Sequence, residues 1–267
     1  MFRSFYIVAL SCILTLPAGC NQPAETVPIW EKVKIRDLAP KHFGKTDNRE
    51  LKTANFDVFI FEIPAENIDL LDDAWQTLYT RPLRYNDYKA FAANSFSAGF
   101  GQSTMWDNIA LLLRNADARE VDSISLLLTD GRTDDLAITF LDREQTIFYV
   151  SNTGLMEAAT IGPGRLALRI KAEKIPGSRG ISTVTFIPVF PSPAKSPIPQ
   201  IAAYEKSGEF LFKPVGFRLK MSPDDFIFLG PKKYSSDQMT LGSLFFSRPQ
   251  PEPTIRTLLI ICSRINY

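Results

Sequence analysis

The apolar and polar positions of the chain follow two different periods, and the first of them begins near residue 55. In "NFDVFIFEIP" (55–64), Phe56, Val58 and Ile60 alternate with Asp57 and Phe59, so both faces are largely apolar. This pattern predicts a strand that is covered on both sides. The next segment, "AENIDLLDDAWQTLY" (65–79), has apolar residues spaced 3 or 4 apart. It predicts a single amphipathic helix.

Two further helices are predicted before the pattern changes. "NDYKAFAAN" (86–94) predicts a short helix capped by Asn or Asp, and "SAGFGQ" (97–102) predicts a break. "MWDNIALLLRNA" (105–116) predicts a helix with Ser103 or Thr104 as its N-cap. The range 55–120 is therefore expected to hold one strand and two or three helices.

From Asp122 onward, short apolar runs are separated by turn residues. This spacing predicts antiparallel hairpins, the first of them around Asp130-Gly131, and "GISTVTFIPVF" (180–190) is expected to pair with "RLALRIKAEKI" (165–175). The Pro-rich segment 191–200 is expected to be a loop, because proline cannot donate to a sheet ladder. Further predicted strands are "SISLLLT" (123–129), "LAITFLD" (136–142), "QTIFYVS" (145–151), "EFLFKPVGFRLKM" (209–221), "DDFIFLGP" (224–231), "LGSLFF" (241–246) and "TIRTLLIICSRI" (254–265).

The last of these strands contains five consecutive apolar residues, from Leu258 to Cys262. A helix needs about 20 residues to cross a bilayer, so this run must be buried in another way. A free sheet edge of this composition would aggregate. We therefore expect an interior strand, paired on both sides, in an α+β fold whose N-terminal strand and two or three helices lead into a mostly antiparallel β domain.

The first twenty residues have the layout of a secretory signal. Arg3 is their only charge, an apolar stretch spans 5–16, and small residues lead to Cys20. The ending "LPAGC" resembles a bacterial lipobox, which implies cleavage before Cys20 and a lipid on that cysteine. A plain signal peptide cut near Ala18 is the alternative. The lipobox interpretation gives a signal peptide at 1–19, a lipid anchor, leash and lead-in at 20–54, and a core domain at 55–267, in which 121–267 is the β-rich part. The protein would be exported and tethered to a lipid bilayer, with the outer membrane, facing the periplasm, as the expected site.

The charge balance does not favour binding to nucleic acid or to an anionic membrane surface. Lys plus Arg number 30 and Asp plus Glu number 29, and no local basic cluster stands out along the sequence. We therefore expect no nucleic-acid partner.

No constellation of residues in the sequence predicts catalysis. His42 is the only histidine, which argues against a Ser-His-Asp triad and the usual zinc sites, and "SPAK" (192–195) matches an S-x-x-K spacing but lies between prolines. The carboxylate pairs are expected to be solvated, on helix surfaces or in turns: Asp72-Asp73, Asp134-Asp135 and Asp224-Asp225. Cys262 is expected to be a buried, inert thiol. The chain is predicted not to be an enzyme and to hold no cofactor and no metal, and a hydrolase that uses Asp224 and Asp225 is the weakest hypothesis.

The order of these segments resembles the core domain of bacterial secretins, the ring-forming outer-membrane channels of type II and III secretion and of type IV pili. The resemblance is carried by "FDVFIFEIPAENIDLLDDAW", "ALLLRNADAREVDS", "ITFLDREQTIFYVSNTG", "GRLALRIKAEKIPGSRGISTVTFIPVF", "FKPVGFRLKMSPDDFIFLGP" and "LGSLFFSRPQPEPTIRTLLIICSRI". The positions that resemble the family are structural: Glu62, Trp75, Gly164, Pro188, Gly230, Leu241, Gly242, Leu244, Phe245, Leu259, Ile260, Arg264 and Ile265.

The resemblance implies a non-catalytic cell-envelope lipoprotein with a secretin-like core, acting as a structural or channel-forming component of a protein secretion or pilus-type assembly. It also implies partners: further copies of the chain, or other components of such a machine, with strands of adjacent subunits sharing ladders. The alternative is a monomeric, membrane-tethered binding or scaffold lipoprotein without channel function.

Overall fold

The computed structural model describes residues 51–191, 209–249 and 251–267. These belong to one compact unit, Glu50–Tyr267. Cys20, His42, the "SPAK" segment and all but the first residue of the predicted 191–200 loop lie outside the described residues.

The closing apolar run is an interior strand, as predicted. Strand β14 (Thr254–Asn266) lies in a first sheet of order β3-β12-β14-β1-β4, in which all pairs are antiparallel. Residues 258–261 pair with β1 on one side and with β12 on the other. The other strands of this sheet are β1 (Thr53–Pro64), β3 (Phe96–Gly101), β4 (Arg119–Thr129) and β12 (Phe226–Pro231), and β13 (Ser247–Arg248) pairs with the start of β14.

A second antiparallel sheet has the order β2-β11-β9-β8-β5. Strands β8 and β9 pair as predicted, and β9 also pairs with the short β10. A separate two-stranded sheet is formed by β6 and β7. The bounds are β2 (Arg84–Tyr85), β5 (Thr133–Leu141), β6 (Gln145–Val150), β7 (Met156–Ile161), β8 (Gly164–Lys174), β9 (Ser182–Phe190), β10 (Phe210–Leu211) and β11 (Phe217–Met221).

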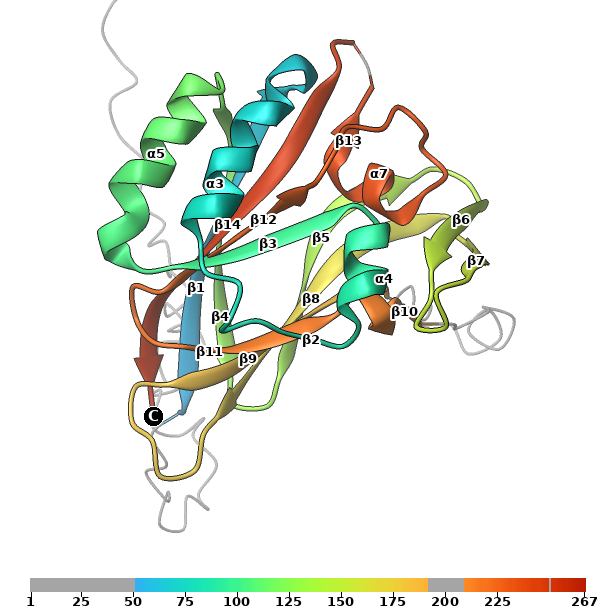
Figure 1. Cartoon of the computed structure of the whole chain (residues 1–267). Coiled ribbons are helices and arrows are strands. Elements are labelled where there is room, and N and C mark those ends of the chain that lie inside the picture. The colour runs from blue at the N-terminus through green and yellow to red at the C-terminus, as the bar shows by residue number, and fades with distance from the viewer. Residues whose placement is uncertain (1–50, 192–208, 250) are drawn as a thin grey trace, which may run out of the picture. The chain divides into compact units, whose positions relative to one another are not determined.

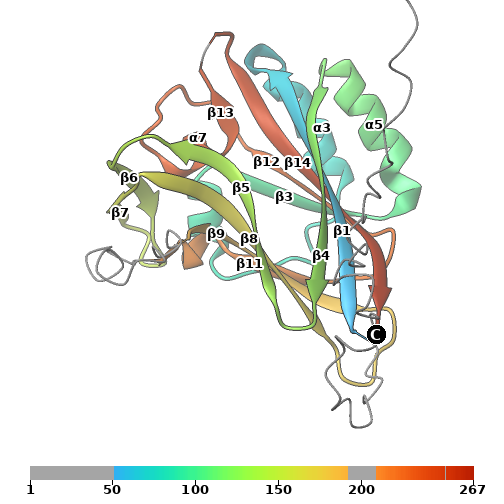
Figure 2. The ribbon, with the colours of Figure 1, turned by 180° about the vertical axis from the view of Figure 1, so that it is seen from behind.

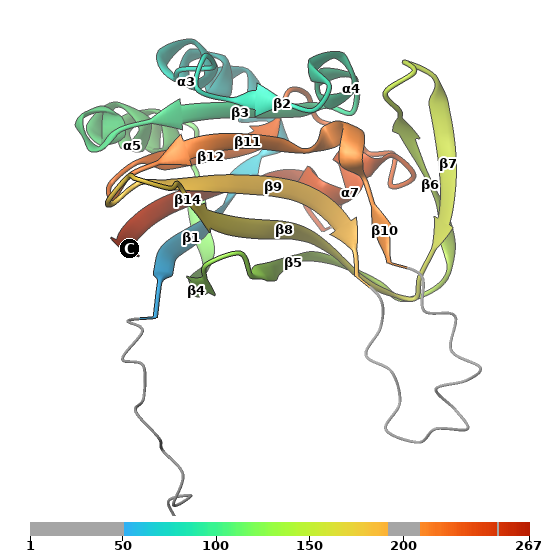
Figure 3. The same ribbon diagram turned by 90° about the horizontal axis from the view of Figure 1, so that it is seen from below.

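The two large sheets pack face to face as a sandwich (Figure 3). Val58 and Ile260 of the first sheet share one hydrophobic cluster with Leu168 and Phe186 of the second. Alternate residues of each strand point into this cluster, which is the usual arrangement of two packed sheets. The cluster forms the main core of the unit.

Helices cover the other face of the first sheet (Figure 1). They are α3 (Leu71–Thr77) and α5 (Trp106–Asn115), which pack on Phe228 and Leu259 in a second cluster. The ring of Trp75 in α3 lies 5.0 Å from the ring of Phe228. The first sheet is therefore dry on both faces where the helices lie, which accounts for the two apolar faces of 55–64.

A short helix, α4 (Tyr88–Ala93), bridges the two sheets at the β3 and β2 side. Asp87 caps it by accepting a hydrogen bond from the Ala90 N–H at 3.0 Å, which agrees with the predicted Asn or Asp cap. The ring of Phe91 lies 5.6 Å from Phe96 in the first sheet and 5.7 Å from Phe217 in the second. The α+β, β-rich, antiparallel fold class is thus confirmed, and among the described residues no helix is long and apolar enough to cross a membrane.

Two predicted boundaries of the helical part are wrong. The segment 65–79 is not one helix, because it starts as a 3-10 turn, η1 (Ala65–Leu70), before α3 begins. Neither Ser103 nor Thr104 caps α5, since both belong to another 3-10 turn, η2 (Ser103–Met105).

The predicted break at 97–102 is also wrong, because most of it belongs to strand β3. Its glycines lie where side chains from other elements pack directly against the backbone of the strand. A Cβ at Gly99 would lie 2.5 Å from the Leu78 Cβ, and one at Gly101 would lie 2.2 Å from the Phe226 Cζ. Glycine in a strand often marks such a close approach.

The predicted strand 241–246 is instead a helix, α7 (Leu241–Phe246), whose six residues are all buried. The Thr240 hydroxyl caps it by accepting from the Ser243 N–H. Because all sides of the helix are buried, no helical period shows in the sequence. A last 3-10 turn, η3 (Lys213–Val215), precedes β11 within the predicted strand 209–221.

Strands β4 and β5 do not form the predicted hairpin at Asp130-Gly131. Strand β4 pairs with β1 in the first sheet, whereas β5 pairs with β8 in the second. The chain therefore crosses from one sheet to the other at this turn, and both strands lie at the same side of the sandwich (Figure 2).

Candidate functional site

The structure brings five of the secretin-like positions together around β14. Leu259 faces the helices and Ile260 faces the second sheet. Gly230 lies between β14 and Trp75, where a Cβ would come within 2.9 Å of the Thr257 Cγ2 and 3.3 Å of the Trp75 Cζ2. The fifth, Glu62, forms an ion pair with Arg256 at 2.7 Å. Apart from that ion pair, these positions serve packing.

The remaining secretin-like positions do not join this group. Leu241, Gly242, Leu244 and Phe245 form most of α7, and a Cβ at Gly242 would lie 2.1 Å from the Asn94 carbonyl oxygen. The others are spread over the strands: Gly164 at the start of β8, Pro188 in β9, and Arg264 and Ile265 near the end of β14. No single cavity collects all thirteen positions.

Asp224 and Asp225 form the turn between β11 and β12. The Ser222 N–H donates to the Asp225 carboxylate at 2.7 Å, and burial raises the pKa of that carboxyl. The Asp224 N–H donates to the Cys262 carbonyl at 2.8 Å, and the Cys262 N–H donates to the Asp225 carbonyl at 2.9 Å. Both residues thus hold the turn against β14. Asp224 is exposed as expected, but the expectation that Asp225 is solvated was wrong, because its side chain is buried in this turn.

Cys262 itself is buried, as predicted. Burial raises the pKa of its thiol to about 12, so the thiol stays protonated and is a poor nucleophile near neutral pH. Within the ranges that the structure describes, no cluster of His, Cys, Asp and Glu is arranged to hold a metal ion.

The other two carboxylate pairs differ in their exposure to solvent and in their ion pairing. Asp72 and Asp73 are exposed on α3, as predicted, and Asp134 is exposed on β5. Asp135 was expected to be solvated but forms a bidentate ion pair with Arg169, whose Nε and Nη2 both lie 2.7 Å from the carboxylate oxygens. This hydrogen bonding raises the pKa of Arg169.

Strand β4 forms an open edge of the first sheet. Ten of its 11 residues pair with β1 on one side, with Val121 left out at a register shift, and on the other side the strand has no strand partner among the described residues. Two of its apolar side chains face solvent, with Leu127 64% and Val121 48% exposed. Long exposed edges readily pair with another chain, and proteins usually protect them.

Charged residues surround the beginning of this edge. Across β4, β1 and β14, Arg119, Glu62 and Arg256 are in register. They line a cavity of about 440 Å³ together with Val121 and Arg248. The lining also includes Asp117 and Glu252, so the cavity continues the β4 edge with a surface of mixed charge.

Arg248 closes this cavity on the inside by linking the two sheets. Its Nη2 donates to the Ile138 carbonyl at 3.0 Å and to the Thr139 hydroxyl at 2.8 Å, both on β5. The Ile138 carbonyl is at a β-bulge and also accepts from Arg256 Nη1 at 3.3 Å. Burial, with the nearby charge of Arg256, lowers the pKa of Arg248 to about 10. These hydrogen bonds were not predicted from the sequence, because no local pattern indicates that Arg248 and Arg256 both reach the Ile138 carbonyl.

No protein-family model matches the sequence, and no curated protein matches it. Among solved structures, the chain is similar to the InvG secretin domain β-barrel from the Salmonella SPI-1 injectisome NC-base. The identity is 9% and the TM-score is 0.22, with 81% of this chain and 64% of that chain covered. The chain thus spans less than two thirds of that neighbour, and a TM-score of this size does not establish a shared fold.

Proposed function

We propose that the chain is a non-catalytic lipoprotein of the cell envelope, tethered through Cys20 to the outer membrane on the periplasmic side. Its core would assemble with further copies of itself, as a structural component of a protein secretion or pilus-type machine. The observation that carries the assembly proposal is the open edge of β4, with exposed Leu127 and Val121.

The physical argument concerns the backbone groups of β4. Along its outer side, N–H and C=O groups point away from β1, and an added strand would satisfy them most regularly over residues 122–129, beyond the register shift at Val121. The same strand would cover Leu127 and Val121, and the burial of apolar surface contributes roughly 25 cal/mol per Å². A second copy could then extend the first sheet without any change in its order.

A monomeric binding or scaffold lipoprotein is the second candidate, and one observation favours it. The interior strand β14 already has both of its neighbours, β1 and β12, within the same chain. The core is therefore complete without a partner, and assembly is not needed for its stability.

Native mass spectrometry of the detergent-extracted protein separates the two candidates. We expect an oligomer for the unchanged chain and a monomer for Leu127→Lys, because a charge on an open edge opposes strand addition. Leu155→Lys is the matched control, since Leu155 is 67% exposed but lies outside β4. Circular dichroism should show that both variants are folded.

A monomeric unchanged chain would refute assembly and support the scaffold candidate. An oligomer that survives Leu127→Lys would show that the contact lies elsewhere. The anchor is tested separately: Cys20→Ser should move the protein from the membrane fraction to the soluble fraction, and unchanged fractionation would refute lipid attachment at Cys20.

A further inference from the structure

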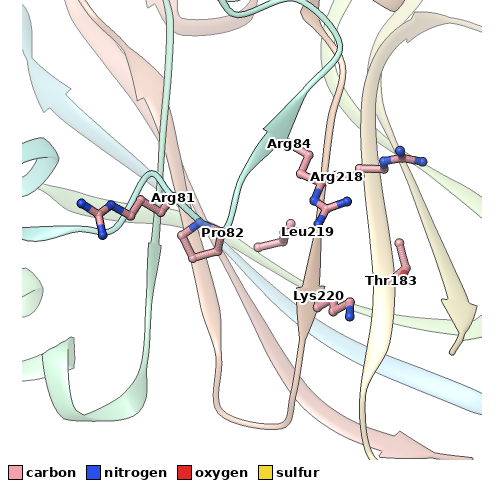
Figure 4. A pocket seen from close by; sticks show the side chains of 7 residues that line it. All are labelled: Arg81, Pro82, Arg84, Thr183, Arg218, Leu219 and Lys220. Carbon is pink, nitrogen blue, oxygen red and sulfur yellow. The ribbon is translucent and has the colours of Figure 1, made fainter. Parts of the chain in front are cut away.

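A second pocket lies on the outer face of the second sheet, away from the β4 edge. Its volume is about 480 Å³, and Figure 4 shows the residues that line it. They are Arg81, Pro82, Arg84, Thr183, Arg218, Leu219 and Lys220. Four of the seven are basic and none is acidic, although the sequence alone showed no basic cluster.

The cluster forms because strand pairing brings distant residues together. Arg84 of β2 stands directly opposite Arg218 of β11, and Lys220 lies two residues further along β11 on the same face. Thr183 of β9 is the register partner of Lys220 and adds a hydroxyl. Arg81 comes from the segment before β2, and its guanidinium points away from the other three cations (Figure 4).

This arrangement is electrostatically unfavourable by itself. Like charges directly opposite each other on neighbouring strands are destabilising. None of the three cations Arg84, Arg218 and Lys220 forms an ion pair with another residue that the structure describes. A bound anion would remove the repulsion.

Two other cations on the same face of the sheet are neutralised. Arg169 of β8 contacts the carboxylates of Asp135 and Glu209, and Lys171 lies 2.7 Å from Glu173. Lys171 and Arg218 flank the same residue of β9, so the paired and the unpaired cations belong to one surface. Arg84, Arg218 and Lys220 therefore differ from these two neighbours in having no carboxylate partner among the described residues.

We propose that this pocket binds a phosphate-bearing ligand through Arg84, Arg218 and Lys220. A guanidinium presents a fork of N–H donors that fits two oxygens of one phosphate, and an ammonium adds a third direction of approach. The Thr183 hydroxyl can donate as well. The volume is in the range of small-molecule sites, so the pocket has room for more than a lone phosphate. The ligand is either the headgroup of an anionic lipid or a soluble phosphorylated molecule.

The test is a binding titration of the detergent-solubilised full chain with two probes. One probe is inorganic pyrophosphate, and the other is short-chain phosphatidylglycerol below its micelle concentration. We expect Arg84→Gln/Arg218→Gln to weaken binding at least tenfold. The control is Arg165→Gln/Lys233→Gln, which removes the same charge from exposed residues outside the pocket and should change the affinity less than twofold.

Each outcome has a defined meaning. Binding of pyrophosphate that depends on the two pocket arginines supports a soluble ligand, and binding of the lipid alone supports a headgroup. Binding of neither probe, or equal weakening in the pocket variant and in the control, would overturn the proposal. The oligomeric state of the protein is not part of this readout, so the result is independent of the proposed assembly.

Discussion

Replacing Ile260 by alanine tests the interior position of β14 directly. The Ile260 side chain has no exposed surface and faces the second sheet. Its register partners are Val58 on β1 and Ile227 on β12, which are also fully buried. The site is therefore enclosed on both flanks, and the surroundings have little freedom to collapse into the space that alanine leaves.

The expected cost follows from the atoms removed. The substitution deletes three carbons, and each buried methylene is worth about 0.8 kcal/mol, which gives roughly 2.4 kcal/mol for lost transfer free energy. The cavity that remains adds a further contribution, and buried Ile-to-Ala changes cost about 2–5 kcal/mol in total. We expect the free energy of unfolding to fall by about 3–4 kcal/mol.

The assay is urea unfolding followed by circular dichroism, with the midpoint and the slope fitted separately. Ile261→Ala is the matched control, because Ile261 is the next residue on the same strand but is only partly buried on the helix side. Ile261→Ala should cost clearly less. An equal or smaller loss for Ile260→Ala would mean that the strand does not lie between the two sheets as described.

Three further predictions concern packing and pH. Gly242→Ala should lower the melting temperature, because the new Cβ would lie 2.1 Å from the Asn94 carbonyl and the backbone would have to shift. The Cys262 thiol has a folded pKa of about 12, above its unfolded value, so its contribution to stability is lost as the pH rises above about 9. Cys262→Ala should therefore make the loss of unfolding free energy between pH 9 and 12 less steep in urea titrations, and an unchanged slope would contradict the assigned burial. Hydrogen bonds from two serine hydroxyls lower the pKa of Asp57, so its contribution is present above about pH 4 and is lost as the pH falls through the lowered folded pKa. Asp57→Asn should flatten the acid limb of the stability curve.

The sequence was sufficient for elements whose burial follows a simple period. The two apolar faces of 55–64 and the run from Leu258 to Cys262 each predicted a strand buried on both sides, and the structure confirms both. The helix at 106–115 and the β8–β9 pair were also predictable, because each has one apolar face and a recognisable turn or end.

Elements without such a period were predicted incorrectly. Helix α7 is buried on every side, so its six residues resemble a strand. Strand β3 contains Gly99 and Gly101, and two glycines in a short segment usually indicate a break. In the structure they leave room for the side chains of Leu78 and Phe226, which lie against the strand at these positions.

The partners of the strands were the hardest part to predict. Asp130-Gly131 is a good hairpin turn, and alternation tells which face of a strand is buried but not which strand lies beside it. For the same reason the basic pocket was missed: Arg84 and Arg218 are far apart in sequence and meet only through the pairing of β2 and β11.

The pairing of β1 with β14 has a consequence for the order of events during synthesis. Phe56 has Cys262 as its register partner, so the centre of the first sheet joins the two ends of the described unit. A ribosome that has not yet synthesised residues 254–266 has made the β1–β4 pair and the β3–β12 pair but not the strand that joins these two pairs. Contacts this distant in sequence form slowly, because a long loop must close first. The first sheet is therefore expected to be completed only after the last strand of the described unit has been synthesised.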